Sequence, residues 1–150
     1  MTFFVGRFTE FSAAGFLASV IVHFLGLLGM SLPVGYSVFL LQFGATVAAF
    51  GAAAAVIILL GREGENFWKM ALGACPKWMK WVTYFLVGYA VFNLIVFLNR
   101  FGNRAGLEPA QIMALVFRGV SGEWMAFYAG SFLVFFSAKC QMHRNAGLGC

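Results

Sequence analysis

Charged side chains are scarce in this chain of 150 residues: Asp, Glu, Lys and Arg together make up 10% of it, whereas hydrophobic residues make up 62%. A soluble globular domain carries roughly a quarter charged residues. A chain of this length forms a single domain, so the apolar excess cannot be the core of a larger soluble body. The shortage of charge therefore excludes a soluble protein and predicts one integral membrane domain, residues 1–150, with the lipid bilayer as its solvent.

The sequence also lacks the common motifs of catalysis and of nucleic-acid binding. It contains no nucleophile–base arrangement, phosphate-binding loop or dinucleotide fingerprint. The net charge of +5 would suit nucleic acid, but there is no basic helix interleaved with aromatic residues and no separate soluble domain. We therefore expect no nucleic-acid partner, favour a non-enzymatic role, and find no cofactor that the sequence requires. One cofactor alternative stays open, which is haem bound by paired His23 side chains across a dimer.

Four apolar runs are long enough to cross the hydrocarbon core of a bilayer, which takes about 20 helical residues for about 30 Å. They cover residues 11–30, 36–60, 81–99 and 119–138. The first run is too long for the apolar region of a cleaved signal, so we expect it to be retained. The fold is thus predicted to be all-α, a polytopic membrane protein with a bundle of four transmembrane helices and a polar tail at 139–150.

The segment between the third and fourth spans can be interpreted in two ways. Pro109 can open a helix, but the apolar stretch 111–117 is too short to cross a bilayer. It would either form an interfacial helix before the fourth span or extend that span outwards. We expect a bend near Gly119 and Gly122, because a single helix over 110–138 would be about 43 Å long.

Basic residues are unevenly distributed between the two sides of this four-span arrangement. The N-terminus, the 61–80 connection and the tail share one side, with seven Lys and Arg against three on the other. The seven are Arg7, Arg62, Lys69, Lys77, Lys80, Lys139 and Arg144, and the three are Arg100, Arg104 and Arg118. Because cytoplasmic loops are enriched in basic residues, both termini are predicted to be cytoplasmic.

Few polar side chains lie within the predicted spans, and apart from Ser and Thr four of them are candidates for a site: His23, Gln42, Asn93 and Glu123. Counting along the spans places all four about 6–11 Å below the outer boundary of the bilayer. Polar groups at such depth are costly and mark candidate functional sites, so one hypothesis is a ligand or proton pocket in the outer half of the bundle. His23 and Glu123 would be its central pair. The alternative is that the four residues form ordinary hydrogen bonds between helices, with Glu123 at the interface.

Small residues spaced by four predict where the helices pack closely, because small side chains let two backbones approach each other in lipid. The second span offers Gly44, Ala48 and Ala52. The fourth offers Gly122, Ala126 and Gly130. We therefore expect the second and fourth spans to lie near the centre of contact.

Three cysteines and one histidine fall on the predicted cytoplasmic side: Cys75, Cys140, His143 and Cys150. They could supply four ligands of the kind that zinc prefers, although the paired spacing of a strong zinc motif is missing. Cytosolic thiols are normally reduced. We therefore expect free cysteines, with a metal or redox site as the alternative.

The stretch Ser121 to Tyr128 reads Ser-Gly-Glu-Trp-Met-Ala-Phe-Tyr. It resembles the closing segment of small, uncharacterised four-helix bacterial integral membrane proteins. In that family we expect Ser-Gly-His-Trp-Met-Ala-Phe-Tyr, so Glu123 stands where the family has a histidine. The resemblance implies a bacterial origin and the same four-span architecture, and it implies no activity. We accordingly expect the protein in the inner membrane of a bacterium.

Two functional hypotheses follow from these observations. The small size and the shortage of catalytic groups favour a non-catalytic structural, assembly or regulatory subunit of a larger membrane complex. Its partners would be other membrane subunits or further copies of the chain. The alternative is a small transporter, or a protein that binds an ion, a quinone or another small ligand in the polar pocket of the outer half.

Overall fold

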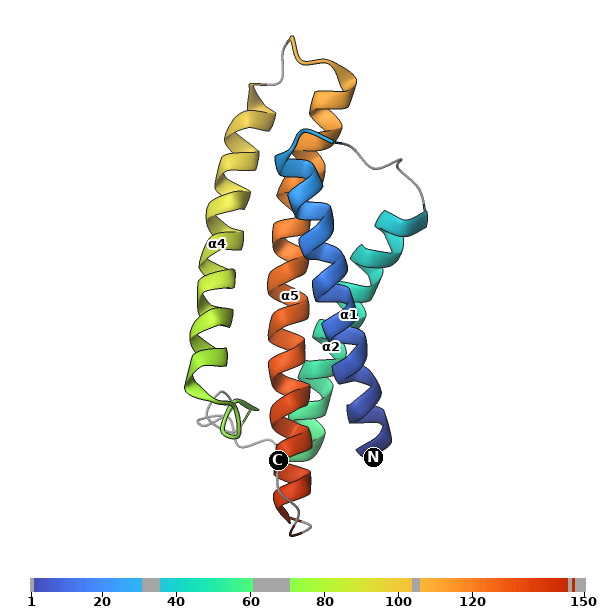
Figure 1. Ribbon diagram of the computed structural model, residues 1–150, viewed down its shortest axis with the longest axis vertical. Helices are drawn as coiled ribbons and strands as arrows, with labels where there is room; N and C mark the ends of the chain where they lie inside the picture. Colours follow the sequence, from blue (N-terminus) through green and yellow to red (C-terminus); the bar gives the residue numbers. More distant parts are fainter. Residues whose placement is uncertain (1, 31–35, 61–70, 104–105, 146, 148–150) are drawn as a thin grey trace.

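The computed structural model describes residues 2–30, 36–60, 71–103, 106–145 and 147, and these residues form helices without any strand. The helices are α1 (Thr2–Leu27), α2 (Tyr36–Leu60), α4 (Lys77–Gly102) and α5 (Pro109–Asn145). They run alternately up and down in one elongated bundle (Figure 1). The predicted all-α helical bundle is confirmed.

Three helices are long and apolar enough to cross a membrane: Phe3–Leu27 in α1, Val38–Ile58 in α2 and Lys77–Gly102 in α4. Large apolar side chains cover their outer surfaces, for example Phe24, Phe50 and Phe85. Exposure of so much apolar surface is unfavourable in water and is ordinary in hydrocarbon. The predicted membrane class is therefore supported through three candidate spans. α5, which carries Arg118 and Glu123, is not among them.

α5 occupies the centre of the bundle and packs against each of the other three helices (Figure 1). Its most extensive contact is with α1, while α4 approaches α5 alone and has no close backbone contact with α1 or α2. We predicted that the second and fourth spans would form the centre of contact. That is correct for α5, but α1 rather than α2 is its main neighbour.

α5 is one uninterrupted helix of 37 residues, about 55 Å long at 1.5 Å per residue. The expected break near Gly119 and Gly122, with a separate interfacial helix before it, is therefore wrong. The apolar stretch 111–117 extends the helix outwards instead. The two glycines allow α4 to pack closely on α5 and do not bend the helix. A Cβ on Gly119 would lie 2.6 Å from Cγ of Phe97, and one on Gly122 would lie 2.6 Å from Nδ2 of Asn93.

The two ends of the bundle differ in what they carry. The start of α1 and the end of α5 lie at one end, which we call the terminal end, and the end of α4 and the start of α5 lie at the other, the distal end (Figure 1). A core cluster near the terminal end includes Val5, Leu72 and Phe135. A second cluster, towards the distal end, includes Trp124 and Tyr128. The polar residues predicted as a site lie in and around this second cluster.

Candidate functional site

His23 on α1 connects three helices through its ring. Its side chain is buried, with Nδ1 3.0 Å from the Ser121 hydroxyl on α5 and Nε2 2.6 Å from the Tyr89 hydroxyl on α4. The Ser121 hydroxyl donates its one proton to the Phe117 carbonyl. With that proton engaged, Nδ1 of His23 donates to Ser121, and Nε2 forms the bond with the Tyr89 hydroxyl. The ring therefore attaches α1 to both α4 and α5.

Asn93 on α4 forms the second polar contact with α5. Its buried amide Nδ2 donates to the Arg118 carbonyl at 2.7 Å and to the Gly119 carbonyl at 3.1 Å. This approach depends on Gly122, where a side chain would occupy the position of the amide. The asparagine therefore holds α4 against the distal half of α5.

Two further bonds join α2 to α5. The indole Nε1 of Trp124 donates to the Gln42 side-chain oxygen. The Tyr128 hydroxyl, about one helical turn further along α5, donates to the Leu41 carbonyl at 3.0 Å. Both aromatic side chains are almost fully buried, whereas Gln42 itself lies at the surface.

Glu123 stands apart from these bonds. It is half-buried and makes no hydrogen bond or ion pair with any residue that the structure describes. It follows Ser121 by two residues, which turns it about 200° around the helix axis from the side facing His23. We expected His23 and Glu123 to form the central pair of the site. The hydrogen bonds of His23 go instead to Ser121 and Tyr89.

Three of the four predicted site residues do share one region of the bundle, but with partners that the sequence interpretation missed. His23, Asn93 and Gln42 each bond to α5 or to an aromatic side chain. The missed partners are Tyr89, Ser121, Trp124 and Tyr128. Their hydroxyl and indole groups at span depth were the available signal, because a polar group there needs a hydrogen-bond partner.

The chemistry of this layer is that of interhelical attachment. A serine nucleophile must donate its proton to a neighbouring base, whereas Ser121 accepts from His23 and donates to its own helix. Ser121 has no exposed surface, so no substrate can reach it. The His23–Ser121 contact therefore fixes α1 on α5 and does not form a catalytic dyad.

No protein-family model, curated protein or solved structure matches this chain. The resemblance of 121–128 to small bacterial membrane proteins therefore stays a prediction. Within that segment, Ser121, Trp124 and Tyr128 each bond to another helix. Its polar residues are those that attach α5 to its neighbours.

The predicted packing residues fall into two groups. Gly44, Ala48 and Ala52 are buried on α2, and Gly122 is buried against α4. Ala126 and Gly130 line a groove of about 200 Å³ between α2 and α5, together with Ala52 and its neighbours Ala49 and Ala53. A Cβ on Gly130 would meet nothing within 4 Å. We call this the α2–α5 groove.

The predicted metal ligands do not form a recognisable centre in the described part of the chain. No three His, Cys, Asp or Glu side chains there are close enough to hold a metal ion, and Cys150 lies outside the described residues. Cys75 is a buried free thiol that donates to the Leu133 carbonyl. Cys140 is disulfide-bonded, so the expectation of free cysteines is wrong at this position. His143 lies in the last turn of α5.

We expect Cys75 to react slowly with thiol reagents. It precedes α4, and burial raises the pKa of its thiol above the ordinary value. Only the thiolate reacts, so a raised pKa lowers the reactive fraction at every pH below it. With Cys140 and Cys150 replaced by Ser, maleimide labelling at pH 7 should be about tenfold slower than for Gly73→Cys made in a Cys75→Ser background. Equal rates for the two thiols would contradict this prediction.

Replacing Asn93 by Leu should destabilise the bundle by about 1–2 kcal/mol, because two interhelical hydrogen bonds are lost. The matched control is Asn99→Leu, since Asn99 lies on the same helix with an exposed side chain. It should change stability by less than about 0.5 kcal/mol. Reversible unfolding in detergent measures both variants. An equal effect at the two positions would show that the Asn93 amide does not hold α4.

Proposed function

We propose that this chain is a four-span integral membrane protein that serves as a non-catalytic structural, assembly or regulatory subunit of a larger membrane complex. The observation that supports this most is the α2–α5 groove, whose small residues are left uncovered within the chain. Small residues of this kind let a helix of another subunit approach closely in lipid. Glu123 lies on the same side of α5, three and seven residues before Ala126 and Gly130, so a helix seated there would also cover the unpaired carboxylate.

The polar residues support a structural role as well. His23, Asn93, Trp124 and Tyr128 are each engaged in bonds between helices. A transport path would need such groups to face a common aqueous space. Their use as attachments fits a rigid scaffold better than a moving carrier.

Affinity purification in mild detergent tests the subunit role. The native protein should recover a membrane partner in fixed stoichiometry. Gly130→Leu should lower that recovery about tenfold or more by filling the groove, and a Cβ at this position meets nothing within 4 Å inside the chain. Gly88→Leu is the matched control, because a Cβ on Gly88 also meets nothing within 4 Å. Recovery of a partner-free monomer from native membranes, or equal effects of the two variants, would contradict the proposal.

We also propose how the chain is placed in the membrane. α5 is the fourth span, the protein lies in the inner membrane of a bacterium, and both termini are in the cytoplasm. The excess of basic residues on the side that the four-span arrangement gives to the termini supports this orientation. The disulfide at Cys140 would favour an oxidising compartment instead, but we give the charge more weight because it draws on seven residues against three. A fluorescent protein fused after Cys150 should fluoresce and a fused alkaline phosphatase should be inactive, and the reverse would overturn the orientation.

Glu123 supports one alternative, a small transporter or a protein that binds an ion, a quinone or another ligand in the outer half of the bundle. Its carboxylate has no partner among the described residues, which is costly at membrane depth unless a cation or another protein group satisfies it. In this case Glu123→Gln would abolish ligand-dependent thermal stabilisation or flux in reconstituted vesicles. Under the subunit proposal it would change only partner recovery.

A further inference from the structure

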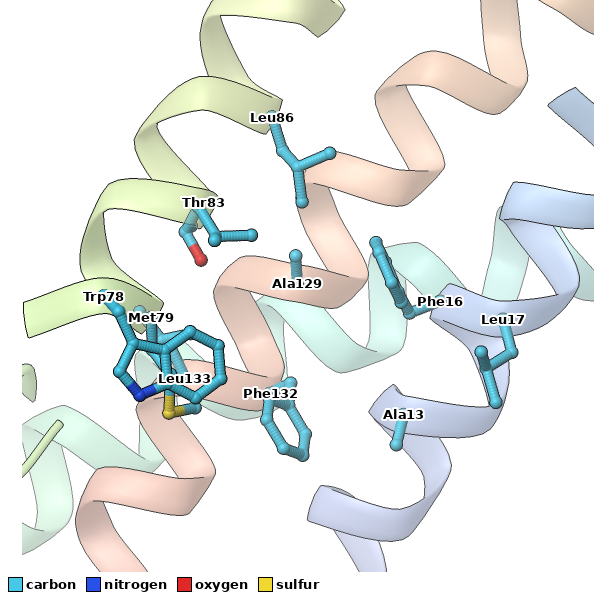
Figure 2. Close-up of a pocket in the computed structure, with 11 residues that line it drawn as sticks. Ala13, Phe16, Leu17, Trp78, Met79, Thr83, Leu86, Ala129, Phe132 and Leu133 are labelled. Atoms are coloured by element: carbon cyan, nitrogen blue, oxygen red, sulfur yellow. The ribbon is translucent and has the colours of Figure 1, made fainter. Parts of the chain in front are cut away.

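A cavity of about 310 Å³ opens between α1, α4 and α5 in the half of the bundle nearer the terminal end (Figure 2). It exists because α1 and α4 both pack on α5 without close contact between their own backbones. The His23–Tyr89 bond joins these two helices towards the distal half. Nearer the terminal end, the small side chains of Ala13 and Ala129 leave the space between the helices open (Figure 2).

The lining of this cavity is suited to hydrocarbon. Apart from the Thr83 hydroxyl and the indole of Trp78, the surrounding side chains are apolar, including Phe16, Leu86 and Phe132. Its volume is at the lower end of the range for small-ligand pockets. Trp78 projects at its edge with two thirds of its surface exposed, 66%, as tryptophan does at the level of lipid headgroups. An alkyl chain fits this lining, and a polar or charged ligand does not.

The same side of α5 becomes basic towards the terminal end. Phe132, which lines the cavity, stacks on Phe136 with ring centroids 6.0 Å apart. Lys139 and His143 follow on that side of the helix, seven and eleven residues after Phe132, so the Cα atom of Lys139 is about 10 Å further along the axis. Among the described residues, the terminal end carries five Lys and Arg against one Glu, namely Arg7, Lys77, Lys80, Lys139 and Arg144 against Glu10. The cavity therefore leads from hydrocarbon to positive charge, which complements the acyl chain and the phosphate of an anionic phospholipid.

We propose that this cavity binds one acyl chain of an anionic phospholipid from the leaflet at the terminal end, with the phosphate at Lys139 and His143. The lipid fills the space that α1 and α4 leave open on α5. The inference requires the chain to be in a bilayer but requires no partner subunit, so its failure leaves the partner-recovery experiment unaffected.

Native mass spectrometry of the delipidated protein, titrated with phosphatidylglycerol and separately with phosphatidylcholine, tests the site. The wild-type chain should bind one phosphatidylglycerol about fivefold more tightly than phosphatidylcholine, which is the contribution of one lysine, Lys139, at the phosphate. Ala129→Leu and, on a different helix, Ala13→Leu should each lower phosphatidylglycerol binding about tenfold or more by occupying the cavity. Ala54→Leu, at an exposed position on α2, is the control.

A second pair of variants tests whether Lys139 binds the lipid phosphate. Lys139→Gln should remove most of the preference for phosphatidylglycerol, whereas Arg100→Gln at the distal end should leave it unchanged. Thermal unfolding in detergent confirms that each variant is folded, and Ala13→Leu decides the result if Ala129→Leu does not fold. Equal binding of the two lipids by the wild-type chain would overturn the proposal. So would loss of binding in Ala54→Leu equal to that in the cavity variants, or retention of a neutral lipid alone.

Discussion

Replacing Trp124 by Ala should lower the free energy of unfolding by about 3–5 kcal/mol, the range for a fully buried large aromatic side chain. Trp124 is 1% exposed and belongs to the core cluster near the distal end. Its loss would leave a space between α2 and α5 and would also remove the indole bond to Gln42. Both effects weaken the attachment of α2, which bonds to α5 at this level.

The control for this prediction is Trp81→Ala. Trp81 lies on α4 and is 72% exposed, so its removal should change stability by less than about 0.5 kcal/mol. Equilibrium unfolding in mixed micelles, followed by the circular dichroism of the helices, measures both variants. Similar losses at the two positions would mean that the distal cluster does not stabilise the bundle as its burial indicates.

Gly15→Ala should destabilise the protein by about 1–3 kcal/mol, the cost of overpacking a close contact. A Cβ on Gly15 would overlap the ring of Tyr128. That ring cannot move aside easily, because it is buried and its hydroxyl is bonded to the Leu41 carbonyl. α1 and α5 would therefore have to separate along their most extensive contact.

Gly88→Ala provides the matched control for Gly15→Ala. Gly88 lies within α4, and a Cβ there meets nothing within 4 Å. The higher helix propensity of Ala should therefore stabilise this variant by about 0.5–1 kcal/mol. In a Tyr128→Leu background, Gly15→Ala should cost less than in the wild type, since the overlapping ring is gone. A Gly15→Ala variant as stable as wild type, or an unchanged cost in the Tyr128→Leu background, would show that the two helices do not depend on this contact.

Much of the helical architecture was predictable from the chain because it depends on local composition. Residues 36–60 were expected to form one apolar helix, and α2 covers that range. The choice of a helix over a strand needs only the apolar length and the demand that backbone groups be satisfied within a segment in lipid. The break at Gly119 and Gly122 was wrong because glycine has the same local signature at a bend and at a close helix contact. Asn93 and Phe97, which pack on these glycines, lie on another helix.

In the candidate site too, the sequence could not show which residues of different helices meet. Depth along each span could be counted from the sequence, and His23, Asn93 and Gln42 do bond in one part of the bundle. The rotation of each helix about its axis could not be counted, because it is set by side-chain packing between segments distant in the chain. For this reason the prediction paired Glu123 with His23, whereas in the structure His23 is hydrogen-bonded to Ser121 and Tyr89.

By itself, the sequence determined that the chain is helical, that its outer surface is apolar enough to suit lipid, and which polar residues lie at similar heights along the helices. These properties follow from composition and from the rise of a helix per residue. Only the tertiary structure decided that α5 is the central helix, that the polar groups attach helices to one another, and that open spaces remain beside Gly130 and Ala129. The reason is that each of these properties depends on which faces of different helices meet, and that is a property of the packed bundle rather than of any one segment.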